Sequence, residues 1–64
     1  MPPKYKEIQT RLEQDGWRIK DQKGSHMQFV HPMKKGKITL AGKPSATPPD
    51  GTYLSILRQA GLKQ

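Results

Sequence analysis

His26 is the residue of this chain best suited to acid–base chemistry, both by its type and by the residues that precede it. Gly24 and Ser25 favour a tight turn, and the alternating residues from His26 onward are typical of a strand. The pattern therefore places His26 on the first rung of a strand just past a bend, where a side chain can meet a substrate. An imidazole usually titrates at about pH 6.5, so it can take up or release a proton near neutral pH.

His31 is the second histidine, five residues further along the same predicted strand. Residues five apart on a regular strand face opposite sides and lie roughly 16 Å apart, so the two histidines cannot flank one phosphate as an acid–base pair. No carboxylate lies near either histidine at a ligand spacing, and we expect neither a metal site nor a cofactor. The residue pattern alone leaves open that either histidine is an ordinary surface residue.

Positive charge dominates the composition. Twelve Lys and Arg against five Asp and Glu give a net charge of +7. Such a field attracts polyanions, chiefly nucleic acid, although a basic surface that merely aids solubility would give the same composition. The chain has no cysteine, which excludes disulfides and thiolate metal sites. No apolar run resembles a signal peptide or approaches the roughly 18 residues of a membrane span, so we expect a cytoplasmic protein without membrane contact.

Hydrophobic periodicity predicts one domain over residues 1–64 that begins with a helix from about Pro3 to Asp15. Its buried stripe has helical spacing and consists of Tyr5, Ile8 and Leu12. Gly16 fits the left-handed position that ends a helix in a Schellman motif, with Trp17 placed over Leu12. Three strands are then predicted from the period-two pattern, over residues 17–23, 26–31 and 37–40.

The second half of the chain contains a long loop and a final helix. Residues 41–51 are rich in Pro and Gly and form the predicted loop. Thr52 is the predicted N-cap of the last helix. The apolar stripe of that helix consists of Tyr53, Ile56, Leu57 and Ala60, and Gly61 ends it as Gly16 ends the first. The predicted order is α-β-β-β-α, an α+β fold with a three-stranded antiparallel sheet.

Two amphipathic helices and one three-stranded sheet can bury their apolar faces only if both helices stack on the same side of the sheet. The side chains expected to point toward the helices are Trp17, Ile19, Phe29, Ile38 and Leu40. The opposite face would then form a cationic plate made of Arg18, Lys20, His26, Gln28, Lys37 and Thr39. Such a plate favours the phosphate backbone, with weak sequence specificity because few aromatic side chains remain for base stacking.

Several motifs together resemble the HicA, or YcfA-like, family of mRNA interferase toxins. They are Gly24-Ser25-His26, followed by Phe29 and His31-Pro32, and the C-terminal run from Pro49-Asp50-Gly51 to Ala60-Gly61-Leu62. Each motif alone is weak, whereas their order and spacing within 64 residues are fairly specific. One departure is that many family members carry a further histidine after the third strand, where this chain has Gly42-Lys43-Pro44. The role of that histidine cannot be transferred, and Lys43 is a speculative substitute.

The resemblance implies a fold like that of double-stranded-RNA-binding domains and metal-independent cleavage of mRNA in the cytoplasm. It also implies that His26 is the catalytic residue and that a HicB-type antitoxin inhibits the toxin. A homodimer and a hetero-oligomer with the antitoxin both stay open. In the mechanism that fits both the residues and the resemblance, neutral His26 takes the proton of an RNA 2′-hydroxyl as it attacks the adjacent phosphorus, which leaves a 2′,3′-cyclic phosphate.

The RNA-binding residues that we predict around His26 are Arg18, Lys20, Lys23, Ser25, Gln28 and Lys37. Any of the four cations among them could stabilise charge on the phosphorane, Ser25 could donate to a phosphate oxygen, and Gly24 shapes the turn. The principal alternative is a non-catalytic RNA-binding module in which His26 contacts a phosphate or a 2′-hydroxyl. A third interpretation is an interaction protein whose basic face docks an acidic partner, which is compatible with the first.

Overall fold

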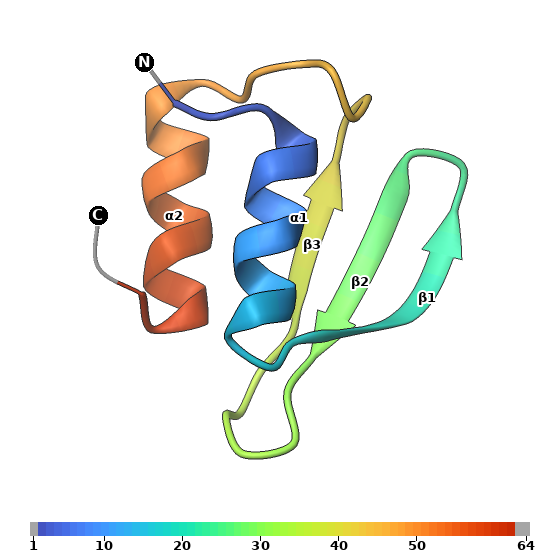
Figure 1. Cartoon of the computed structure of the whole chain (residues 1–64), viewed down its shortest axis with the longest axis vertical. Coiled ribbons are helices and arrows are strands. Elements are labelled where there is room, and N and C mark those ends of the chain that lie inside the picture. The colour runs from blue at the N-terminus through green and yellow to red at the C-terminus, as the bar shows by residue number, and fades with distance from the viewer. Residues whose placement is uncertain (1, 63–64) are drawn as a thin grey trace.

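A computed structural model describes residues 2–62 and shows the α-β-β-β-α order that the sequence predicts. The elements are α1 (Tyr5–Gln14), β1 (Arg18–Lys23), β2 (His26–Val30), β3 (Ile38–Ala41) and α2 (Asp50–Ala60). The strands pair antiparallel in the order β1-β2-β3, and the two helices lie side by side next to this sheet (Figure 1). The predicted fold class is therefore confirmed. Neither helix in this part of the chain is long and apolar enough to cross a membrane.

The end of α1 has the predicted Schellman geometry. Gly16 adopts a φ of +103°, which favours glycine, and its N–H donates to the Glu13 carbonyl oxygen at 3.1 Å. The Trp17 N–H donates to the Leu12 carbonyl oxygen at 3.0 Å. The chain thus reverses immediately after the helix, and Trp17 enters the core with no exposed surface.

The second helix ends as predicted but begins earlier. Gly61 has a φ of +70°, and the Leu62 N–H donates to the Leu57 carbonyl oxygen at 2.9 Å. At the other end, the helix begins at Asp50, and the Pro49 carbonyl oxygen accepts the first helical hydrogen bond. Thr52 therefore lies inside the first turn, and the prediction that it caps the helix is wrong.

The core lies between the helices and one face of the sheet. Its largest fully buried side chains are Leu12, Trp17, Phe29, Ile38 and Leu40. Met27 and Phe29 on β2 are buried, whereas His26 and Gln28, which alternate with them, are exposed. The predicted inward and outward faces of β2 and β3 are thus confirmed.

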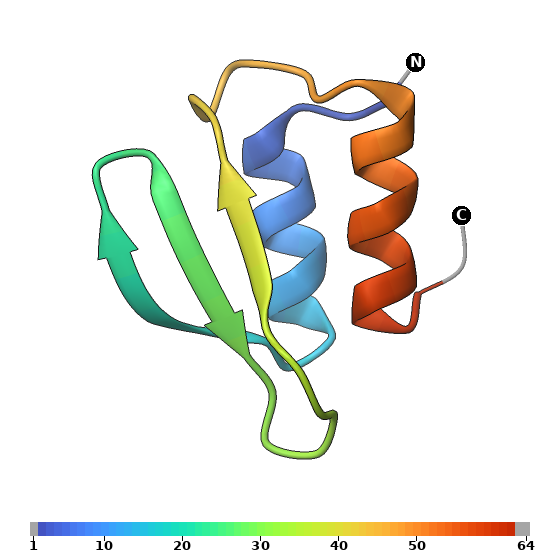
Figure 2. The same ribbon diagram turned by 180° about the vertical axis from the view of Figure 1, so that it is seen from behind.

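The first strand departs from the prediction. Ile19, expected in the core, is 39% exposed, and every residue of β1 is exposed. Figure 2 shows the physical reason: β1 is the edge strand farthest from the helices, and the β1–β2 hairpin extends away from them. No helix therefore covers the side of β1 on which Ile19 lies, and the placement of Ile19 in the core is wrong.

The loop between β3 and α2 packs against the start of α1 and forms hydrogen bonds with it. The Tyr5 N–H donates to the Ala46 carbonyl oxygen at 2.9 Å and the Lys6 N–H to the Pro44 carbonyl oxygen at 3.1 Å, which satisfies two N–H groups of the first helical turn. Gly42 packs on the Tyr5 ring so closely that a Cβ atom would lie 2.4 Å from Tyr5 Cε2. This contact requires glycine at position 42.

Candidate active site

A two-residue hairpin loop places His26. Gly24 has a φ of +60° and Ser25 a negative φ, the combination that a type II′ turn uses between paired strands. Lys23 and His26 therefore become direct cross-strand partners, and the Gly42 N–H steadies the turn by donating to the Ser25 carbonyl oxygen at 3.4 Å. The turn thus fixes which strand residue faces His26.

Cross-strand partners share one face of a sheet, so His26 forms a row with Lys23 on one side and Ala41 on the other. All three residues are exposed and lie on the face away from the helices, because Met27 next to His26 points into the core. Opposed residues have Cβ atoms about 4.5–5.5 Å apart. The ammonium group of Lys23 is therefore within reach of a ligand that binds the His26 imidazole.

A bulge in β1 brings a residue to this face that strict alternation would place elsewhere. Ile19 pairs with Phe29 but Asp21 pairs with Gln28, so Lys20 between them has no cross-strand partner. Beyond the bulge, Asp21 and Lys23 share the face of Gln28 and His26. The regular alternation expected through Lys20 is therefore wrong, and a carboxylate joins the predicted cationic plate.

The row of Lys23 and His26 and the neighbouring row of Asp21 and Gln28 border a shallow hollow of about 390 Å³. It is lined by residues of all three strands: Asp21, Gln22, Lys23, His26, Gln28 and Thr39. The structure thus brings together the predicted residues Lys23, His26 and Gln28, with Thr39 beside them. Sequence reasoning missed Asp21 and Gln22, because the bulge leaves no signal in the pattern of residue types.

The other predicted site residues lie outside the lining of the hollow. Arg18 is on the same face but opposite Val30, four residues along β2 from His26 and so roughly 13 Å from it. Ser25 lies in the turn, Lys37 precedes β3, and Lys43 follows it, all exposed. Their exposure and distribution make them candidates for contacts to a longer polyanion.

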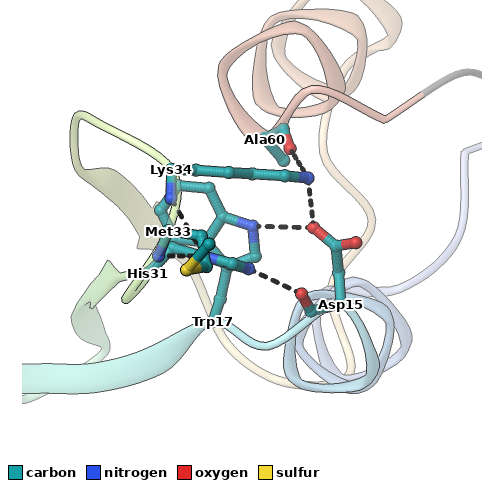
Figure 3. A network of polar contacts seen from close by, with 6 residues as sticks. All are labelled: Asp15, Trp17, His31, Met33, Lys34 and Ala60. Carbon is teal, nitrogen blue, oxygen red and sulfur yellow. Dashed lines mark hydrogen bonds and ion pairs between the residues drawn. The ribbon is translucent and has the colours of Figure 1, made fainter.

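Within residues 2–62, no protein group hydrogen-bonds to the His26 ring, whereas every nitrogen of the His31 ring is engaged. His31 Nδ1 accepts hydrogen bonds from the N–H groups of Met33 at 2.9 Å and Lys34 at 3.1 Å. That nitrogen therefore carries no proton, and Nε2–H donates to the Asp15 carbonyl oxygen at 2.7 Å. The ring also packs edge-on against Trp17, with centroids 5.2 Å apart (Figure 3).

Lys34 joins His31, Asp15 and Trp17 in a cluster of polar contacts separate from the hollow. Its ammonium group donates to the Asp15 carboxylate and, at 2.8 Å, to the Ala60 carbonyl oxygen at the end of α2 (Figure 3). The same carboxylate accepts a hydrogen bond from Trp17 Nε1 at 3.2 Å. The hydrogen bond from Lys34, followed by the effect of its charge, lowers the pKa of Asp15 below the usual 3.8. The cluster ties the ends of both helices to the loop after β2.

No three side chains of the types that ligate metals come together within residues 2–62 in an arrangement that could hold a metal ion.

The chain matches the family model of the HicA toxins of bacterial toxin–antitoxin systems over residues 5–62, nearly its whole length. It belongs to the HicA toxin family. The HicA match makes the chain the toxin of a toxin–antitoxin system, which acts in a pair with an antitoxin. No curated protein matches this HicA sequence.

Proposed function

We propose that this HicA toxin is an endoribonuclease that cleaves mRNA with His26 as general base, without a metal ion or a cofactor. The observation that carries the proposal is the placement of His26: its ring is exposed, has no protein partner within residues 2–62, and faces a hollow beside Lys23. A free imidazole is available to take a proton from a substrate, and the adjacent ammonium group suits a phosphate.

In the proposed reaction, His26 takes the proton of a ribose 2′-hydroxyl while the 2′-oxygen attacks the adjacent phosphorus. The new bond joins phosphorus to O2′, the bond from phosphorus to O5′ breaks, and the leaving oxygen takes a proton from the solvent. The products are a 2′,3′-cyclic phosphate and a 5′-hydroxyl. Among the four candidate cations, Lys23 is the one that lines the hollow beside His26, so we assign it the stabilisation of the phosphorane charge.

Family membership supports the rest of the proposal. We propose a HicB-type protein as the antitoxin, the cytoplasm as the place of action, and one catalytic domain as the organisation of the chain. The HicA match over residues 5–62 supports these proposals. Arg18, Lys20 and Lys37 are proposed to bind the RNA backbone outside the hollow, where exposed cations release counterions without reading sequence.

The test uses end-labelled single-stranded RNA in the presence of a chelator, with product analysis. The wild type should leave a 2′,3′-cyclic phosphate, and DNA of the same sequence should bind and stay intact because it lacks the 2′-hydroxyl. Lys23→Ala should slow cleavage about tenfold or more, whereas Lys6→Ala, which removes the same charge from an exposed site on α1, should have little effect.

The result that would overturn the proposal is salt-sensitive RNA binding without cleavage, together with no growth arrest when the toxin is expressed without its antitoxin. That outcome would favour the non-catalytic RNA-binding module. Cleavage that depends on an added metal ion would contradict the proposed role of His26 as the principal base.

A further inference from the structure

The hollow contains a second row of side chains, next to the row of Lys23 and His26. Asp21, Gln28 and Thr39 are successive cross-strand partners on β1, β2 and β3, and all three line the hollow. Gln28 lies two residues from His26 on the same strand, a separation of about 6.6 Å. The base of a nucleotide whose ribose contacts His26 can therefore reach this row.

The composition of the row is unlike that of the surrounding surface. Asp21 is a carboxylate in a region otherwise suited to phosphate, where it weakens the attraction of a polyanion. Gln28 and Thr39 are uncharged and can both donate and accept hydrogen bonds. A carboxylate acceptor beside two side chains that can donate or accept hydrogen bonds is a poor binding site for phosphate. The same row suits the edge of a nucleobase, which carries both donors and acceptors.

One contact determines which atom of Asp21 can meet a base. The backbone N–H of Gln22 donates to Asp21 Oδ1 at 2.9 Å, and no other protein group within residues 2–62 hydrogen-bonds to this carboxylate. This contact holds the carboxylate and leaves Oδ2 as an acceptor for a ligand. Adenine, cytosine and guanine carry an exocyclic amino group that can donate to such an oxygen, whereas uracil presents one N–H flanked by two carbonyl oxygens.

We propose that Asp21, with Gln28 and Thr39 beside it, reads the base on the 5′ side of the cleaved bond, and that it selects bases with an amino group against uracil. The proposal rests on the ribonuclease function proposed above, because His26 defines which nucleotide lies over the row. It adds a base preference to a surface whose sequence specificity is otherwise expected to be weak.

The test uses four DNA oligonucleotides that each contain a single ribonucleotide, with A, C, G or U as its base, so that cleavage is confined to that nucleotide. Wild type should cleave the uridine substrate roughly tenfold more slowly than the other three, the fold-change expected for one mismatched hydrogen-bonding group. Asp21→Asn keeps Oδ1 for the Gln22 N–H and replaces the free acceptor by an amide donor. This variant should cleave the uridine substrate within about threefold of the others.

Glu13→Gln serves as the control, because it removes the same charge from an exposed position on α1. It should keep the wild-type preference against uridine, although both variants bind all oligonucleotides slightly more tightly. An equal loss of cleavage on all four substrates in Asp21→Asn would mean that Asp21 merely supports the hollow, and the proposal would be wrong. A wild type that cleaves all four equally would also overturn it.

Binding separates this proposal from the proposed function. The same four oligonucleotides are titrated against His26→Ala, with and without Asp21→Asn. Weaker binding of the uridine oligonucleotide that disappears with Asp21→Asn would support base reading even if the wild type cleaves nothing, in which case the ribonuclease proposal alone fails. If the wild type cleaves nothing, equal binding of all four oligonucleotides to His26→Ala would exclude base reading.

Discussion

The two ends of β2 each carry a histidine next to a turn, and the two differ in almost every physical respect. His26 at the first end is exposed, faces the open side of the sheet and has no protein hydrogen bond within residues 2–62. His31 at the other end is half-buried against Trp17, and both of its ring nitrogens are occupied by backbone groups. The same side chain is thus free to act on a ligand at one end and holds the fold at the other.

A glycine near each histidine shows the same difference: Gly24 precedes His26 by two residues, and Gly16 at the end of α1 lies against His31. Gly24 has a φ of +60°, and a Cβ atom there would meet nothing within 4 Å. Gly16 has a φ of +103°, and a Cβ atom would lie 2.8 Å from His31 Nε2, within the space of the hydrogen bond to Asp15. The turn at the open end depends on backbone conformation alone, whereas the turn at the closed end also depends on a tight contact.

This difference predicts the largest effect on stability. Gly16→Ala should lower the free energy of unfolding by about 3 kcal/mol, because it combines an unfavourable φ with a collision at His31. Gly24→Ala should cost about 1 kcal/mol, since only the backbone conformation is strained. Urea unfolding followed by tryptophan fluorescence measures both. Equal losses in the two variants would mean that the contact at His31 contributes nothing, and the comparison would fail.

A smaller effect concerns the acid stability of the closed end. Because Lys34 lowers the pKa of Asp15 in the folded protein, the carboxylate stabilises the fold above its usual pKa of 3.8, and this contribution is lost as the pH falls through the lower folded value. The wild type should therefore lose stability as the pH falls from about 5 to below 3.8, and Asp15→Asn should lose less over the same range.

Removing the partner of Asp15 provides the matched control. Lys34→Met takes away the hydrogen bond and the charge that lower the pKa of Asp15. Its free energy of unfolding should therefore fall less at low pH than that of the wild type, as in Asp15→Asn. Urea unfolding at pH values above and below 3.8 provides the measurement. If Asp15→Asn and Lys34→Met both kept the full wild-type loss at low pH, the pair would have no role in acid stability.

The helix ends and the faces of β2 could be predicted from sequence because local rules determine them. Gly16 and Gly61 each follow an apolar stripe and precede an apolar residue, which is the pattern of a Schellman motif. His26 and Gln28 alternate with Met27 and Phe29, and this period-two pattern fixes their exposure. The exposed position of His26 was therefore a correct prediction from residue order alone.

The composition of the hollow could not be predicted, because β1 has almost no hydrophobic pattern to set its register. Ile19 is its one strongly apolar residue, so a one-residue bulge costs no core contact and turns Asp21 toward Gln28. The start of α2 was also predicted wrongly, because Pro49 occupies the N-cap position without any side-chain capping hydrogen bond, so no capping side chain marks this helix start in the sequence. The role of His31 depends on Asp15, sixteen residues away in the chain.

The most direct test of the difference between the two histidines compares His26→Ala with His31→Ala in RNA cleavage and in urea unfolding. His26→Ala should cut RNA about 10²–10⁴-fold more slowly while its free energy of unfolding stays within about 0.5 kcal/mol of the wild type. His31→Ala should be less stable by about 2 kcal/mol, and its folded fraction should cleave within a few-fold of the wild-type rate. Wild-type cleavage by His26→Ala would contradict the account, as would loss of cleavage by an equally stable His31→Ala.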